Sequence, residues 1–458
     1  MGLRFASMRA SLLLSTALIL LPLADATAAD SIEDAMAKAY GGNPTLTAER
    51  ANMRAIDENV PQAKALLRPT VTGQGDVGYA YENTSSSVLG QGSLAPRDVS
   101  VGVTQPLWTG GRADAAISQA EFQVKAERAN LLNVEETVLL QAATAYLDVV
   151  RDEALLEIAI SNVTVLTQNL KETKAQLAVG VATQTDLAQA QASLVQAIAG
   201  QEQAQANLTN SRAQYLQIVG EMPGTVVLPG PVANLPLSQD DAVKLASSNN
   251  PQVLTAKANE EAARAGIDVA SANLMPSLGI TGQLLHAEDQ QLQGPREDSA
   301  QILLTLTVPI YQAGAEYSKI RQAKESFGDA RDQVDVAVRQ AIFAATQAWQ
   351  NYQANLANVS SFESQVKANT IAYQGTVEEQ RVGTRTTLDV LNAQQALITS
   401  QANVTTSQHD ALVNAYQLKT AVGDMTAQSL SLQVERYDPT KHYDAVRNQW
   451  IGTEPGDP

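Results

Sequence analysis

Side chains that could perform chemistry are sparse in this sequence. The three histidines, His286, His409 and His442, lie far apart and lack the spacing of metal ligands. The chain has no cysteine, which excludes thiolate chemistry, iron–sulfur clusters and cysteine-based zinc sites. It also has no nucleophile elbow, Walker loop or zinc-protease motif. We therefore expect no metal, no cofactor and no enzymatic activity.

One glycine-rich segment fits the fingerprint of a dinucleotide-binding site. It is GQGDVG at residues 73–78. That chemistry needs a helix N-terminus directly after the glycines, because the helix holds the pyrophosphate. Here the segment lies within alternating apolar and polar residues, and no helical pattern follows it. We interpret these glycines as packing residues of a strand.

The most distinctive cluster of polar side chains follows a glycine at the end of a long helical pattern. It spans 382–391 with the sequence VGTRTTLDVL, and a weaker copy, VGVATQTDL, spans 179–187. Arg385 and Asp389 are four residues apart, so on a helix they would share one face. A weak ion pair within one helix is the simplest interpretation of these two charges.

Length, composition and charge limit the kind of fold that holds these residues and the partners that it can bind. The 458 residues are about three times a typical domain of roughly 150 residues, so two domains or a repeat are expected. Hydrophobic residues make up 44% and charged residues 17%, which excludes a disordered chain. Lys and Arg total 31 against 48 Asp and Glu, and the net charge of -17 would repel a phosphate backbone. We therefore expect no nucleic acid partner.

The first residues have the pattern of a secretory signal peptide, which we predict to span 1–29. Arg4 and Arg9 precede an apolar run at 11–24, and small residues at 26–29 offer a cleavage site. An uncleaved anchor is the alternative, but the run is shorter than the roughly 20 residues that a spanning helix needs. The export signal leaves the periplasm, the outer membrane or the medium as the location.

The remaining chain consists of two similar halves. SIEDA at 31–35 has the counterpart SQDDA at 238–242, and Asn43-Pro44 matches Asn250-Pro251 at the same offset. Later landmarks keep nearly the same offset, which indicates an internal duplication. We predict a first repeat at 30–222, a linker at 223–237, a second repeat at 238–425 and a C-terminal equatorial tail at 426–458.

Hydrophobic periodicity changes in the same order in both repeats. Each begins with a helical, alanine-rich pattern that a proline ends, at Pro69 and at Pro276. Apolar and polar residues then alternate, which predicts strand hairpins at 69–109 and 276–313. Each strand has about 10 residues, the length that a tilted strand needs to cross a membrane.

Long helical patterns follow Gly111 and Gly314. Each runs for about 70 residues, on the order of 100 Å at 1.5 Å per residue, and a returning helix of about 35 residues begins after Gly180 or Gly383. Apolar residues recur every seven positions with one step of eleven, which is the pattern of a coiled coil with a stutter. In the first copy this seam consists of Ile117, Val124, Leu131, Val138, Ala145, Leu156, Val163, Leu170 and Leu177.

Four membrane-length strands cannot close a barrel within one chain. An open sheet edge in lipid leaves backbone groups unpaired, at a cost of several kcal/mol each, so closure requires several copies. Two copies would give about eight strands, the minimum of natural barrels, and three copies about twelve with a wide lumen. The fold class expected is mainly α with membrane β: duplicated coiled-coil hairpins plus four transmembrane strands per chain.

At this point the sequence resembles the TolC family of trimeric outer-membrane channel-tunnels, over nearly the whole mature chain. The segment at 382–391 resembles the family's helical-hairpin tip, and the tail at 437–443, ending in Trp450, is similar to tails of type I secretion members. Lipidated efflux members carry an N-terminal cysteine, which this chain lacks. The resemblance implies a trimer with a 12-stranded β-barrel continuous with a periplasmic α-barrel.

The resemblance also implies roles for residues at the tips. Asp389 matches an aspartate that rings the closed periplasmic entrance, while Asn392 stands where the family has a second aspartate. Arg385 matches an arginine that latches neighbouring hairpins through the positions of Thr185 and Asp186. A tyrosine that assists this latch in some members is replaced by Gln380. The residues implied for adaptor docking are Val179, Gly180, Thr183, Val382, Gly383, Thr384 and Thr386.

The function implied is export through the outer membrane, with a large periplasmic portion. The partners implied are two further copies, a periplasmic adaptor, an inner-membrane ABC or proton-driven transporter, and outer-membrane lipid. The tail favours type I protein secretion. Small-molecule efflux is the alternative, and a periplasmic coiled-coil protein without a pore is a third possibility, which leaves the four alternating strands unexplained.

Overall fold

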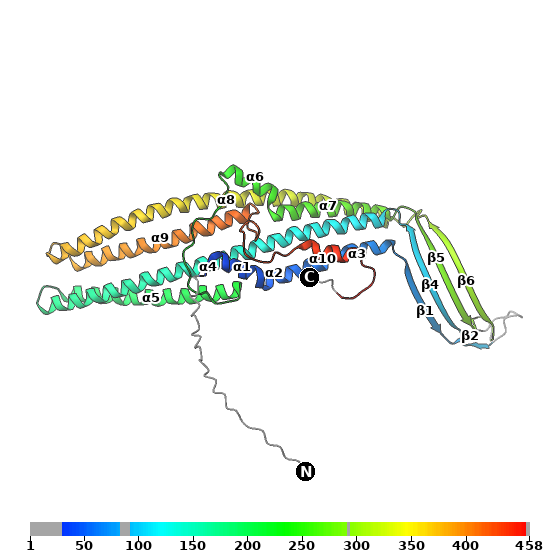
Figure 1. Ribbon diagram of the computed structural model, residues 1–458, viewed down its shortest axis with the longest axis horizontal. Coiled ribbons are helices and arrows are strands. Elements are labelled where there is room, and N and C mark those ends of the chain that lie inside the picture. The colour runs from blue at the N-terminus through cyan, green and yellow to red at the C-terminus, as the bar shows by residue number, and fades with distance from the viewer. Residues whose placement is uncertain (1–29, 83–91, 291–293, 455–458) are drawn as a thin grey trace, which may run out of the picture.

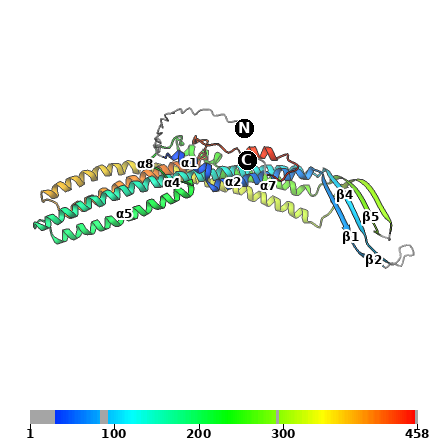
Figure 2. The same ribbon diagram turned by 60° about the horizontal axis from the view of Figure 1, so that its bottom comes forward.

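The computed structural model describes residues 30–82, 92–290 and 294–454 (Figure 1). The predicted signal peptide at 1–29 lies outside the described residues. The molecule is long and narrow, with helices along most of its length and a sheet at one end (Figures 1 and 2).

The first repeat follows the predicted order of helices, strands and long helices. Its elements are α1 (Ile32–Gly42), α2 (Pro44–Asp57), α3 (Asn59–Lys64), the 3-10 helix η1 (Ala65–Leu67), β1 (Thr70–Val77), β2 (Ala80–Glu82), β3 (Gly92–Leu94), β4 (Arg97–Trp108), α4 (Arg112–Ala178) and α5 (Gln184–Val219). The glycine fingerprint at 73–78 falls in and just after β1, as the strand interpretation expected.

The second repeat has the same order of elements. They are α6 (Gln239–Asn249), α7 (Pro251–Ala272), β5 (Ser277–Glu288), β6 (Arg296–Thr307), α8 (Ala315–Arg381) and α9 (Thr387–Ala421), followed by α10 (Pro439–Val446) in the tail. Helices α4 and α8 each have 67 residues, which confirms the two long helical patterns.

The short helices are more broken than the periodicity predicted. We expected one continuous helix before each proline, but the chain breaks at Asn43 and again at Asn250, each followed by a proline at the first helical position. Asn43 Nδ2 donates to Ile218 O at 2.9 Å, and Asn250 Nδ2 donates to Ala421 O at 3.1 Å. At each break, the asparagine therefore holds the C-terminal end of the returning helix of the same repeat, α5 or α9.

The predicted coiled-coil seam lies on the packed side of α4. None of the nine seam residues of α4 is exposed, and five of them are buried, namely Val124, Leu131, Val138, Ala145 and Leu170. The helices form two antiparallel hairpins, α4 with α5 and α8 with α9, and α9 also packs against α4. The two hairpin tips lie at the end of the molecule opposite the sheet (Figure 2).

Four of the strands form one antiparallel sheet with the order β1-β4-β5-β6. The register places mostly apolar side chains on one face and polar side chains on the other. The apolar face carries Val71, Val99, Val101, Val103, Leu278, Ile280, Leu284, Ile302, Leu304 and Leu306. The polar face carries Thr70, Thr72, Gln74, Ser100, Thr104, Thr281, Gln283, Gln301 and Thr305.

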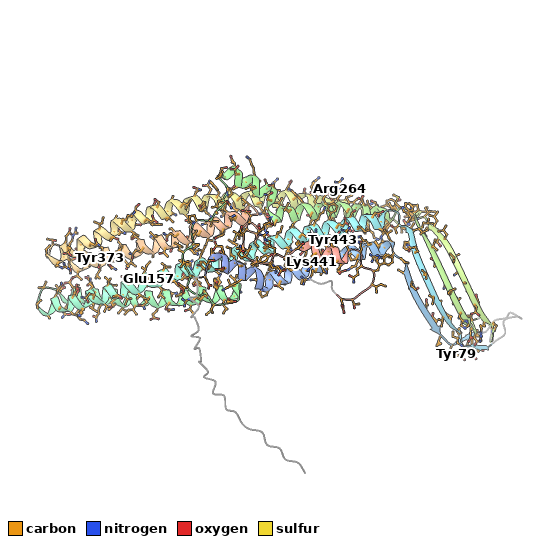
Figure 3. The ribbon with its side chains drawn as sticks, viewed as in Figure 1. Tyr79, Glu157, Arg264, Tyr373, Lys441 and Tyr443 are labelled. Carbon is orange, nitrogen blue, oxygen red and sulfur yellow. The ribbon has the colours of Figure 1, made fainter. Side chains whose placement is uncertain are left out.

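The tail packs along the short helices of the first repeat. Tyr437 N donates to the Tyr40 hydroxyl at 3.0 Å, and Lys64 Nζ donates to Arg447 O at 3.1 Å. On α10, His442 Nδ1 lies 3.0 Å from Asp57 Oδ2 in a buried contact, and Tyr443 and Lys441 lie midway along the molecule (Figure 3). The tail therefore packs against the middle of the molecule, along the short helices of the first repeat.

Within the described residues, none of the helices is both long enough and apolar enough to cross a membrane.

Candidate site at the helical hairpin tips

Both hairpins turn in the same way. A glycine with a left-handed backbone follows the long helix, at Gly180 (φ 81°) and at Gly383 (φ 84°). A Cβ at either position would meet no atom within 4 Å, so the backbone angle rather than space favours glycine. The returning helix then begins after an N-cap threonine, Thr183 or Thr386.

Each N-cap threonine forms a capping box with the aspartate three residues later. Asp389 Oδ2 accepts from Thr386 N at 2.9 Å and from Thr386 Oγ1 at 2.8 Å. Asp186 Oδ2 accepts from Thr183 N at 2.8 Å and from Thr183 Oγ1 at 2.7 Å. The two aspartates therefore secure the start of α5 and of α9.

These hydrogen bonds also fix the charge of both carboxyl groups. The backbone N–H and the hydroxyl of Thr386 hold the pKa of Asp389 below its ordinary value. The hydroxyl and backbone N–H of Thr183 lower the pKa of Asp186 in the same way. Both tips thus present a carboxylate that stays charged at neutral pH.

The expected ion pair between Arg385 and Asp389 on one helical face is wrong. Arg385 lies in the turn before α9 begins, so it is not on a helix with Asp389. Its Nε atom instead lies 2.9 Å from Oε2 of Glu379, near the end of α8, and both side chains are about half exposed. Thr384 Oγ1 donates to Glu379 O at 2.9 Å, which holds the turn against the helix.

Glu379 is a tip residue that the sequence analysis missed. The only available signal was a carboxylate six positions before Arg385, across the predicted turn. In the first tip the equivalent positions are Gln176 and Ala182, so that tip lacks this pair of charges. The two tips therefore have the same backbone conformation but differ in charge.

Within one chain, the structure does not bring Arg385 together with Thr185 and Asp186. Arg385 pairs with Glu379 of its own hairpin, formed by α8 and α9, whereas Asp186 caps α5 in the other hairpin. A latch between these residues can form only where hairpins of neighbouring copies meet, so it remains a prediction.

Asn392 lies one turn of α9 beyond Asp389, beside a groove of about 640 Å³ between α4, α5 and α9. Leu388 and Leu391 line the same groove. Deeper along it, Gln394 Nε2 donates to Asn162 Oδ1 at 3.3 Å, which joins α9 to α4. Asp389 itself does not line this groove. Asp389 and Asn392 thus differ in surroundings as well as in charge.

Apolar side chains are exposed at both turns. Val179 is 75% exposed and Val382 is 76% exposed. Gln380 Nε2 is 3.5 Å from Thr387 Oγ1, so the residue in the place of the family tyrosine contacts its own hairpin. The tips combine exposed valines, capped helix starts and charges, which is a surface suited to binding a protein.

Comparison with known proteins agrees with this architecture. The model of one family, described as outer membrane efflux protein, matches residues 36–221 and 242–424. The outer membrane efflux protein BepC of Brucella suis biovar 1 is 34% identical over 431 residues, which cover 93% of this chain and 92% of that protein. The outer membrane protein TolC of Vibrio cholerae is 24% identical over 422 residues, which cover 89% of this chain and 94% of that protein.

A solved structure shows the same fold. The crystal structure of the CmeC outer membrane channel of Campylobacter jejuni has a TM-score of 0.78 to this chain at 15% identity, and covers 91% of this chain and 89% of its own. The two segments that the family model matches coincide with the two structural repeats, from α1 to α5 and from α6 to α9. The chain therefore belongs to the outer membrane efflux protein family, and it is an outer-membrane protein of the TolC-like channel fold.

Proposed function

We propose that three copies of this chain form a continuous export duct through the outer membrane and the periplasm. The observation that carries the proposal is the sheet, in which β1 and β6 each pair on one side only among the described residues. Strand direction alternates from β1 to β6, so β6 of one copy would meet β1 of the next in the antiparallel sense. Every copy added in this way extends one closed antiparallel barrel.

The two faces of the sheet support a membrane barrel with a wet interior. The apolar face, with residues such as Leu284 and Ile302, suits lipid, and the polar face, with Gln283 and Gln301, suits a water-filled lumen. Eight strands would leave an interior just wide enough for side chains, whereas twelve leave a channel. This difference favours three copies over two.

The long helices extend the duct into the periplasm. Helices of 67 residues have a length on the order of 100 Å, with the tips at the far end from the sheet (Figure 1). In the proposed closed state, Asp389 and Asn392 of each copy surround the entrance, and Arg385 reaches the Thr185 and Asp186 region of a neighbouring copy. A periplasmic adaptor docks at the exposed tips around Val179, Gly180, Val382 and Gly383.

The energy for export comes from an inner-membrane pump, an ABC or proton-driven transporter, that the adaptor connects to the duct. We propose proteins secreted by a type I system as the cargo, because the tail at 437–443 is similar to tails of such members. Small-molecule efflux is the second candidate, since the relative that is 34% identical is named an efflux protein.

Two experiments test the proposal. Purified protein in a planar bilayer should open discrete channels, and the absence of any conductance would leave a periplasmic protein without a pore. Deleting the gene should remove one or a few large proteins from the culture supernatant if the cargo is protein. An unchanged supernatant, together with greater sensitivity to small toxic compounds, would assign the duct to efflux.

A further inference from the structure

A cluster of charged side chains around the buried ring of His409 joins α9 to α4 between the tips and the equator. His409 of α9 is 7% exposed. Its Nε2 atom lies 2.9 Å from Oδ1 of Asp148 on α4, and its Nδ1 atom lies 2.9 Å from Oδ1 of Asp410, the next residue of α9. Glu157, labelled in Figure 3, lies further along α4 toward the tip that follows Ala178.

This geometry determines the protonation state in which every contact is satisfied. A charged carboxylate only accepts hydrogen bonds, and neutral histidine carries one N–H donor. Two carboxylate oxygens at 2.9 Å from the two ring nitrogens of His409 can therefore both accept only when the ring carries two protons. A neutral ring would leave a lone pair facing one of the two carboxylates.

The charges around the ring favour a protonated His409 only in sum, because three carboxylates outweigh the one guanidinium of Arg151, which by itself opposes the second proton. Arg151 Nη1 lies 2.8 Å from the same Asp148 oxygen and 3.5 Å from His409 Nε2, and Arg151 Nε lies 2.8 Å from Asp152 Oδ1. Three carboxylates thus face one guanidinium and one imidazole. Without the proton the cluster has an excess of two negative charges, and with it an excess of one.

Within the described residues, the neighbouring helices α8 and α5 add no unpaired cation beside the ring. The hydrogen bond from Asn369 to Ala396 sets the register of α8 on α9, and it places the stretch 350–362 of α8 beside His409. That stretch contains no charged residue. On α5, Arg212 is already paired with Glu153 of α4 at 2.7 Å.

We propose that His409 is a proton-dependent clamp between the two hairpins, and that it sets how readily the entrance opens. The clamp rests on the proposed function, because an entrance surrounded by Asp389 and Asn392 of α9 widens only when α9 shifts, and α9 packs against α4. Protonated His409 holds Asp148 and Asp410 together and keeps the tips closed. Loss of the proton removes one charge-assisted hydrogen bond, which weakens the clamp by up to roughly tenfold in the open-to-closed ratio.

Channel recordings between about pH 5.5 and about pH 8.5, where histidines change charge, test the clamp. The unaltered channel should spend up to roughly tenfold more time in its higher-conductance state at the upper end. His409→Gln should abolish this dependence. Asp410→Asn is the matched variant. The amide can accept a hydrogen bond from a protonated Nδ1 of His409 or donate one to an unprotonated Nδ1, and the contact to Asp148 remains. It should abolish the pH dependence and keep the closed state.

A spectroscopic measurement tests the protonation directly. Nitrogen NMR of histidine-labelled protein, with the signals assigned by their loss in His409→Gln, should show two protonated ring nitrogens at the acidic end. One unprotonated nitrogen across the whole range would overturn the clamp, as would a pH dependence that survives in Asp410→Asn. If neither the unaltered protein nor any variant conducts, that result counts against the proposed duct and not against the clamp. The NMR measurement would still determine the protonation state of His409.

Discussion

Glu136 on α4 provides the sharpest prediction about stability. Its side chain is 1% exposed, and its Oε1 atom has no hydrogen-bond partner among the described residues. Burial raises the pKa of this carboxyl group to about 8, and the N–H of Met425, which favours the charged form, offsets only part of the effect. Neighbouring Glu135 and Asp424 raise it further. The group is therefore largely neutral at pH 7.

The sign of the effect on stability follows from the proton. The folded state binds this proton more tightly than the unfolded chain, whose carboxyl has a pKa of 4.5. The resulting stability is fully present below about pH 4.5 and is lost as pH rises to about 8. Each pH unit within that interval costs about 1.4 kcal/mol, so the whole interval costs on the order of 5 kcal/mol.

Replacing Glu136 by Gln keeps the shape and the acceptor for Met425 N–H but removes the titration. We expect nearly equal thermal unfolding midpoints at pH 5, and a clearly higher midpoint for Glu136→Gln at pH 8. Glu157→Gln, an exposed change on the same helix, is the control and should follow the unaltered protein. Parallel pH profiles for the unaltered protein and Glu136→Gln would refute the assignment of a buried, neutral Glu136.

Three further predictions concern the tips and the helix breaks. Arg385→Ala should raise single-channel conductance in planar bilayers, because it removes the cation of the proposed latch; an unchanged conductance would argue against the latch. Asn392→Asp should add a second carboxylate near each Asp389, so that multivalent cations block the channel at lower concentration; equal blocking curves would show that Asn392 does not face the entrance. Asn250→Ala should lower the free energy of unfolding by about 1 to 2 kcal/mol in denaturant titrations, since it removes an N-cap and a bond to Ala421 O. Asn358→Ala, on the exposed side of α8, is its control, and equal losses would refute the role of the break.

Much of the fold was predictable because its signals are long and repeated. The two 67-residue helices, the alternating strands and the glycine turns each occur twice, so each copy supports the interpretation of the other. The seam at Val124 and Leu131 was predictable because burial follows directly from the heptad spacing.

The errors came from local geometry that a hydrophobic pattern does not encode. The Asn-Pro pairs at Asn43 and Asn250 served as landmarks of the repeat, yet they also break the helix, because the amide caps one helix while proline begins it. Arg385 falls before the N-cap at Thr386, which removes it from the helical face assumed for it. When the predicted start of a helix is wrong by a few residues, the predicted partners of the charged residues near that start are wrong as well.

Contacts between charged side chains far apart in the chain could not be predicted from one sequence. Asp57 and His442 are 385 positions apart, and Asp148 and His409 are 261 apart. No local pattern relates residues at such separations, and the register between helices is set by tertiary packing. The charged clusters therefore emerged only from the structure.

In the proposed duct, β6 of one copy pairs with β1 of the next to close a barrel of three copies. The chain has no cysteine, so cysteines introduced at Thr72 and, in separate variants, at Gln301, Leu303 or Thr305 are the only ones present. These positions share the polar face of the sheet. Oxidation in cells should link at least one pairing into a ladder that ends at three chains. Ladders that end at two chains, or no linkage at any of the three registers, would contradict the trimeric barrel.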